Sequence, residues 1–174
     1  MLEEKHPDFA QSLNNLGVLH NYQGYYESAE LLFKDALLIR KKIFGESHPA
    51  VARSLSNLAS SYFRQDRYKD ASICFEEALD IYRQTIGENH PDTATAWHNL
   101  AHVYSAQSHY IRAERCYLKA FEISYQRLGD RNPRTRTVRD NFVDFLNQVI
   151  EVKQIHLLSD HPTTQYILQR LLQE

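Results

Sequence analysis

Apolar residues recur along the chain at helical spacing, and the whole pattern returns every 42 residues. On the first helix of each repeat the recurring positions are Leu13, Leu16, Gly17 and His20, then Leu55, Leu58, Ala59 and Tyr62, then Trp97, Leu100, Ala101 and Tyr104. On the second helix they are Ala29, Phe33 and Ala36, then Ala71, Phe75 and Ala78, then Ala113, Tyr117 and Ala120. One apolar stripe per helix predicts two amphipathic helices in each repeat.

Prolines and glycines mark the ends of these helices with the same period. The repeated positions are Pro7, Pro49, Pro91 and Pro133, followed by Gly45, Gly87 and Gly129. Proline suits the first turn of a helix, and glycine suits a left-handed cap at its end. Residues 1–131 are therefore predicted to hold three repeats, at 6–47, 48–89 and 90–131. Residues 132–174 are predicted to form a partial fourth repeat and capping helices.

The repeat resembles the tetratricopeptide repeat, in the 42-residue form found in kinesin light chains. The resemblance rests on the large residue–Leu–Gly/Ala–aromatic spacing of the first helix and the Ala–aromatic–Ala spacing of the second. It implies an all-α fold, a right-handed α-solenoid of helix-turn-helix repeats. It also implies a non-catalytic scaffold that binds a peptide or a segment of a partner protein in a concave groove.

The two ends of the chain depart from the repeat. Residues 141–158 read as one long helix, which breaks at residues 159–162 and precedes a final helix carrying Leu168 and Leu171. A solenoid needs such an end piece to cover its last apolar face. Residues 1–5 align with the end of a second helix, so the chain opens within a repeat. We expect a longer parent protein, or cover of this end by a partner or by self-association.

Composition excludes several classes of partner. The formal net charge is −2, which favours neither nucleic acid nor an anionic membrane. No apolar run approaches the roughly 20 residues needed to span a bilayer, and the N-terminus does not read as a signal peptide, so we expect a cytoplasmic protein. Cys74 and Cys116 occupy equivalent repeat positions and are interpreted as small apolar packing residues.

The chain shows none of the common catalytic motifs. A glycine-rich phosphate loop, a nucleophile elbow and a Cys/His metal framework are missing, so the sequence predicts neither an enzyme nor a cofactor. His98 and His102 lie four residues apart and could share a metal ion, but no third ligand is evident. We interpret them instead as solvated histidines that titrate near pH 6–7. We predict a structural role, in the turn that starts a helix, for three histidines that each precede a proline: His6, His48 and His90.

Next to each apolar stripe lies a face whose residues vary from repeat to repeat. Its predicted partner-binding residues are Asn14, Asn21, Arg53, Ser56, Ser60, Phe63, Arg64, His98, His102, Asp140 and Asp144. Variable polar side chains on a regular scaffold are typical of a binding surface. The alternative function is a regulatory sensor domain of a larger signalling protein, whose superhelix responds to a peptide or a small ligand.

Four asparagines stand at one constant position beside this face: Asn15, Asn57, Asn99 and Asn141. They are predicted to hydrogen-bond between repeats, because an unmet buried amide costs about 1–3 kcal/mol. Recognition of a bound backbone is the alternative. Four arginines, Arg131, Arg134, Arg136 and Arg139, cluster at a helix start, where positive charge opposes the helix dipole. A basic turn paired with Asp130 and Asp140 is preferred, and a site for an acidic peptide or a phosphate is the alternative.

Overall fold

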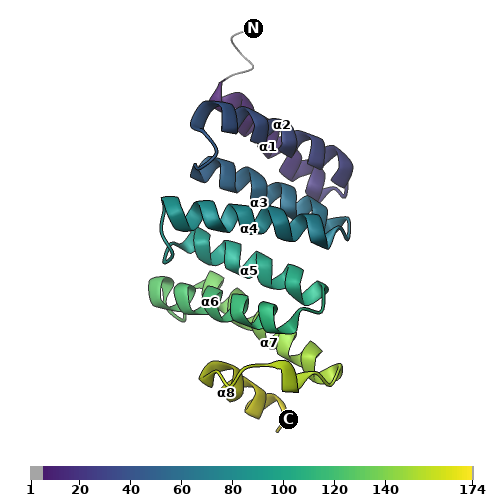
Figure 1. Ribbon diagram of the computed structural model, residues 1–174, viewed down its shortest axis with the longest axis vertical. Helices are drawn as coiled ribbons and strands as arrows, with labels where there is room; N and C mark the ends of the chain where they lie inside the picture. The colour runs from purple at the N-terminus through teal and green to yellow at the C-terminus, as the bar shows by residue number, and fades with distance from the viewer. Residues whose placement is uncertain (1–5, 174) are drawn as a thin grey trace. The chain divides into compact units, whose positions relative to one another are not determined.

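The computed structural model describes residues 6–173 (Figure 1). Its α-helices are α1 (Pro7–Tyr22), α2 (Tyr26–Phe44), α3 (Pro49–Arg64), α4 (Tyr68–Thr85), α5 (Pro91–Ala106), α6 (Tyr110–Leu128), α7 (Pro133–Glu151) and α8 (Pro162–Leu171). A short 3₁₀ helix, η2 (Ile155–Leu157), lies between α7 and α8. No β-strand occurs in residues 6–173. None of the helices within that range is long and apolar enough to cross a membrane.

The chain divides into two compact units, Met1–Glu88 and Asn89–Glu174. We call them unit 1, with α1 to α4, and unit 2, with α5 to α8. In unit 1 each helix packs against the next one along the chain. Unit 2 follows the same order, with a smaller contact between α7 and α8. Consecutive pairing of this kind is what amphipathic helices joined by short turns produce.

A histidine caps the first helix of each complete repeat. The Nδ1 atoms of His6, His48 and His90 accept hydrogen bonds from the backbone N–H two residues later, at 3.3, 3.1 and 3.1 Å. Proline then occupies the first helical position, where no N–H is needed. At the start of α7, Asn132 takes this role through Oδ1, 2.9 Å from the N–H of Arg134. The predicted turn role of the three histidines is confirmed.

The core of each repeat forms where a small residue on one helix faces a ring on the next. Phe33, Phe75 and Tyr117 are at most 3% exposed. In the first repeat the small residue is Gly17, and a Cβ added to it would lie 2.6 Å from Cε1 of Phe33. Glycine at this position therefore lets α1 lie directly on the ring.

The first repeat is less buried than its neighbours. Leu16 on α1 is 42% exposed, whereas its equivalents Leu58 and Leu100 are 4% and 2% exposed. In unit 1, α2 packs against α3, whereas within the described residues α1 has no preceding helix to cover it. Residues 1–5, on which the prediction about the N-terminal end rests, lie outside the described part of the chain. Self-association through that end stays a prediction.

The long helix predicted for residues 141–158 is wrong in its C-terminal part. α7 ends at Glu151, and Lys153 adopts a left-handed backbone with φ 58°. The N–H of Gln154 then donates to the carbonyl of Val149 at 3.0 Å, which satisfies a free carbonyl at the helix end. α3 ends in the same way, with the N–H of Arg67 on the carbonyl of Tyr62. The final helix is present as α8.

Candidate functional site

In unit 1 the predicted binding residues of α3 form what we call the α3 face: Arg53, Ser56, Ser60, Phe63 and Arg64. Both serine hydroxyls donate to carbonyls of their own helix, Ser56 to Ala52 and Ser60 to Ser56, each at 2.9 Å. Their hydroxyl donors are therefore already used. Arg53 and Arg64 are exposed near the two ends of the helix, and Phe63 is half-buried with its ring centroid 5.4 Å from that of Tyr68.

The structure corrects the role expected for Asn14. Its side chain is only 4% exposed, so it does not present a free surface to a partner. Instead, Oδ1 of Asn14 accepts a hydrogen bond of 2.8 Å from Nδ2 of Asn57. The constant asparagine of the second repeat thus binds the variable residue of the first, and joins α3 to α1.

The same relationship recurs in unit 2. Nδ2 of Asn141 on α7 lies 2.9 Å from Nε2 of His98 on α5, and the pair is again separated by 43 residues. Asn57 and Asn141 therefore make bonds between repeats, as predicted. Asn15 differs, because it is exposed and accepts from Nε2 of Gln11 on its own helix at 2.7 Å. Asn99 is half-buried on α5.

One polar atom of the predicted site is left without a partner. Oδ1 of Asn21, at the end of α1, is buried and accepts no hydrogen bond. The third-repeat equivalent of Asn21 is Ser105, whose hydroxyl donates to Oε1 of Gln148 at 2.9 Å. The residue equivalent to Gln148 in unit 1 is Arg64. A buried acceptor without a donor costs free energy.

A buried cation lies beneath the start of α3. Arg40 of α2 is 3% exposed, and its guanidinium donates to Ser54 Oγ at 2.7 Å, Gln11 Oε1 at 2.8 Å and the Ala50 carbonyl at 3.2 Å. All three acceptors are neutral. Burial lowers the pKa of Arg40, and the positive charge of Arg53 lowers it further. Among the described residues no carboxylate pairs with either arginine, although buried charges are usually paired.

Arg40 was not among the residues predicted from the sequence. The only available signal was a break in the repeat, because Tyr82 and Ser124 occupy the equivalent positions in the next two repeats. A charged residue on the buried side of a second helix could have been noticed as an exception. Its three acceptors come from α1 and α3, which only the folded chain brings together.

In unit 2, His98 and His102 are not the solvated histidines we expected. Their Nε2 atoms lie 3.3 Å apart, and His102 Nδ1 lies 3.2 Å from the hydroxyl of Tyr117. Burial lowers the pKa of His98 to about 4, with a smaller contribution from His102, and burial also lowers the pKa of His102. The expectation that they titrate near pH 6–7 is therefore wrong for His98, and burial shifts the pKa of His102 in the same direction.

The remaining predicted residues of unit 2 are charged and lie on α7 or, for Arg131, in the turn before it. Asp140 and Asp144 are exposed, as are Arg131, Arg134 and Arg136. Arg139 is partly covered and pairs with Asp130 at 3.2 Å and Asp140 at 3.3 Å. These two ion pairs favour the local counter-charge interpretation for Arg139. An acidic-partner site at the other three arginines stays a prediction.

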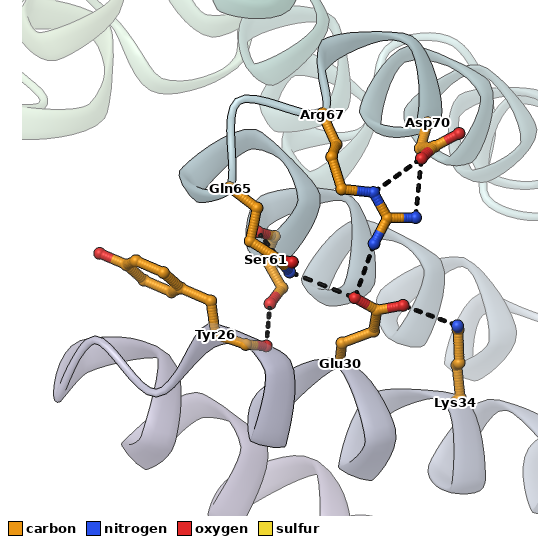
Figure 2. A network of polar contacts seen from close by, with 7 residues as sticks. All are labelled: Tyr26, Glu30, Lys34, Ser61, Gln65, Arg67 and Asp70. Carbon is orange, nitrogen blue, oxygen red and sulfur yellow. Dashed lines mark hydrogen bonds and ion pairs between the residues drawn. The ribbon is translucent and has the colours of Figure 1, made fainter.

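Two glutamates at equivalent positions of the second helices bind other elements. Figure 2 shows Glu30 of α2 between Lys34, Gln65 and Arg67, and Arg67 also binds Asp70. These contacts tie α2 to the turn after α3. In unit 2 the equivalent residue is Glu114, which is 2% exposed and binds the capping segment instead.

Glu114 holds the C-terminal cap through three hydrogen bonds. Its carboxylate accepts from the N–H of Ser159 at 2.9 Å, the Ser159 hydroxyl at 2.6 Å and the Thr164 hydroxyl at 2.7 Å. Charge-assisted bonds of this kind are about twice as strong as neutral ones. A buried glutamate thus fixes both the turn before α8 and its first residues.

One pocket of unit 2 includes a residue of the predicted basic patch. It has a volume of about 770 Å³, lies among α6, α7 and α8, and is lined by Phe121, Arg139, Phe142, Tyr166 and Arg170. In residues 6–173 no group of three or more His, Cys, Asp or Glu side chains is placed to hold a metal ion. Cys74 is partly exposed and Cys116 is buried.

Comparison with known proteins points to one family. The family model described as "Tetratricopeptide repeat" matches residues 8–84 and 55–126, which together exceed half of the chain. No curated protein sequence matches. The confirmed fold class is all-α, an α-solenoid of helix-turn-helix repeats with C-terminal capping helices.

Two solved structures are similar over nearly the whole chain. BtubC (BKLC) from P. vanneervenii has 24% identity and a TM-score of 0.74, and the match covers 94% of this chain and 64% of that one. A Podosopora anserina putative kinesin light chain with nearly identical TPR-like repeats has 23% identity and a TM-score of 0.73, covering 97% of this chain and 87% of that one. The family model, which matches more than half of the residues, shows that this chain belongs to the tetratricopeptide repeat family.

Proposed function

We propose that unit 1 binds an acidic segment of a partner protein along the α3 face. Tetratricopeptide repeats generally mediate protein–protein interactions, and proteins of this family are typically non-catalytic scaffolds. The carrying observation is the pair Arg40 and Arg53, which have no carboxylate partner among the described residues. A carboxylate brought by a partner would supply the missing charge.

The arrangement of α3 supports an extended ligand. Arg53 and Arg64 are eleven residues apart, which is about 16 Å along a helix rising 1.5 Å per residue. About five residues of an extended chain cover that distance. Between the arginines, Ser56 and Ser60 are small and bond to their own helix, so they leave room for a backbone.

The end of the face offers one further contact. Phe63 is half-buried, and aromatic side chains are common where proteins meet. We expect a ligand with carboxylates near both arginines and an apolar side chain near Phe63.

The proposal is tested by fluorescence anisotropy with labelled twelve-residue peptides. One peptide alternates glutamate with small residues and carries a leucine near one end, and its matched partner has lysine in place of glutamate. We expect saturable binding of the acidic peptide alone, weakening as salt rises from 50 to 300 mM. Equal binding of both peptides, or of neither, would overturn the proposal.

Charge reversal locates the contact. We expect Arg53→Glu to weaken binding of the acidic peptide at least about tenfold, or about 1.4 kcal/mol. Arg127→Glu is the matched control, since Arg127 is an exposed arginine on α6 in unit 2 with the same change in net charge. If both variants bind alike, the effect comes from net charge and the α3 face is not the site.

A further inference from the structure

Three polar side-chain atoms from two helices converge beside the ring of Tyr117. They are Nε2 of His98, Nε2 of His102 and the terminal amide nitrogen of Asn141. The three separations are 3.3 Å between the imidazoles, 2.9 Å from Asn141 to His98, and 3.3 Å from Asn141 to His102. The two histidines lie one turn apart on α5, and Asn141 comes from α7 in the following repeat.

This triangle has the size of one face of a tetrahedral metal site. Zinc binds imidazole nitrogen at about 2.0–2.1 Å, so neighbouring ligand atoms in a tetrahedron lie about 3.3–3.4 Å apart. Two of the three edges match this value and the third is shorter. We propose that His98, His102 and Asn141 bind a divalent transition-metal ion of the zinc class, with the two imidazoles as the main ligands.

The side-chain amide of Asn141 can contact the imidazoles when the site holds no metal and can bind the metal when it does. In the metal-free arrangement its NH₂ group lies within hydrogen-bond distance of both imidazole nitrogens. Half a turn about the last side-chain bond exchanges the nitrogen with the carbonyl oxygen, which is similar in size. The oxygen would then be the third ligand, because the oxygen of a neutral side-chain amide coordinates metal ions and its NH₂ nitrogen does not.

The surroundings suit metal binding in three ways. Burial lowers the pKa of both imidazoles and so favours the neutral form, which a metal requires. The Tyr117 hydroxyl at 3.2 Å from His102 Nδ1 can accept the N–H there, which leaves the lone pair on Nε2. Asp144 acts electrostatically on Tyr117, so it places negative charge close to the site.

The site is also open enough to fill. His98, His102 and Asn141 are each partly exposed, which leaves an approach for the ion. A fourth position would be taken by water or by Asp144, which lies three residues after Asn141 on α7. The sequence alone showed only the histidine pair, and the fold adds the third ligand from the next repeat.

Calorimetric titration of the chelator-treated chain with Zn²⁺ at pH 7.5 tests the proposal. We expect one ion per chain with micromolar affinity, and a Tm that rises with Zn²⁺ concentration. With Co²⁺ we expect the strong visible absorption of a four-coordinate ion. Absence of saturable Zn²⁺ binding by the wild-type chain would overturn the site without any variant.

Substitutions separate a metal site from a hydrogen-bond cluster. We expect His98→Gln to weaken Zn²⁺ binding at least tenfold, whereas His156→Gln, at an exposed histidine on η2, leaves it unchanged. Asn141→Asp replaces a neutral oxygen ligand with a charged one, so we expect Zn²⁺ to bind at least tenfold more tightly. A merely structural Asn141 predicts no such gain, and unchanged or weaker binding by Asn141→Asp would contradict its role as a ligand.

Discussion

Asn57 of the second repeat donates a hydrogen bond of 2.8 Å to Oδ1 of Asn14 in the first, across 43 residues of sequence. Asn141 reaches His98 over the same offset at 2.9 Å. In both cases the constant residue of one repeat binds the variable residue of the repeat before it. The variable residue must therefore be able to hydrogen-bond the constant amide, which limits its use for binding a partner.

Removing the Asn57 amide should destabilise unit 1. We expect Asn57→Ala to lower the free energy of unfolding by about 1–3 kcal/mol, because it leaves the buried Oδ1 of Asn14 without a donor. Urea denaturation followed by circular dichroism measures this change. Asn15→Ala is the matched control, since Asn15 is exposed, and we expect less than about 0.5 kcal/mol there. Equal losses at the two positions would contradict the role of the bond.

Asparagine should replace a capping histidine without loss of stability, whereas alanine should not. At the start of α7, the first helix of the fourth repeat, Asn132 is the capping residue. The earlier repeats use His6, His48 and His90 at this position. We therefore expect His90→Asn to keep the stability of the chain, and His90→Ala to lower it by about 0.5–2 kcal/mol. Thermal and urea denaturation of the two variants measure the difference. If both variants lose stability equally, the ring of His90 matters for another reason than its acceptor atom.

Acid should destabilise the fold through His98. Its pKa is about 4 in the folded chain and near 6.5 when exposed, so the unfolded state binds the proton more readily. Stability attributable to this group is full above pH 6.5 and falls as the pH drops from 6.5 towards 4. Between pH 7 and 5 we expect a loss on the order of 2 kcal/mol.

Urea denaturation at a series of pH values checks this prediction. His98→Gln keeps a polar side chain but cannot take the proton, so its stability should change less over the same interval. The difference between the two curves isolates the histidine from other titrating groups. A difference that does not vary with pH would show that the pKa of His98 is not lowered.

The C-terminal cap should depend on Glu114. We expect Glu114→Ala to cost about 1–3 kcal/mol, because it strands the buried Thr164 hydroxyl and removes the acceptor for Ser159. Hydrogen exchange should show the loss most strongly in α8. Glu151→Ala, at an exposed glutamate ending α7, serves as the control. Unchanged protection of α8 would mean that apolar contacts, and Leu168 in particular, hold the cap.

The end of α7 in the C-terminal region could not be predicted from the local sequence. The apolar pattern continued past Val149, so a single helix to residue 158 was expected. Helix α7 ends at Glu151 because Lys153 adopts a left-handed backbone conformation. Glycine is the usual residue at such a position, so a lysine there gave no signal in the sequence. The bonds that hold the next segment come from Glu114, 45 residues earlier than Ser159. Local pattern carries no information about that distant acceptor.

The sequence by itself determined the helices, their pairing and the family, because spacing, capping residues and ring positions are local features repeated three times. It also indicated a repeated asparagine with a bonding role. Only the tertiary structure decided which partners Asn57 and Asn141 bind, that Asn14 is buried, and that burial lowers the pKa of His98 and His102. The physical reason is that burial and partner choice depend on atoms about 43 residues away, which adjacent repeats bring within 3 Å.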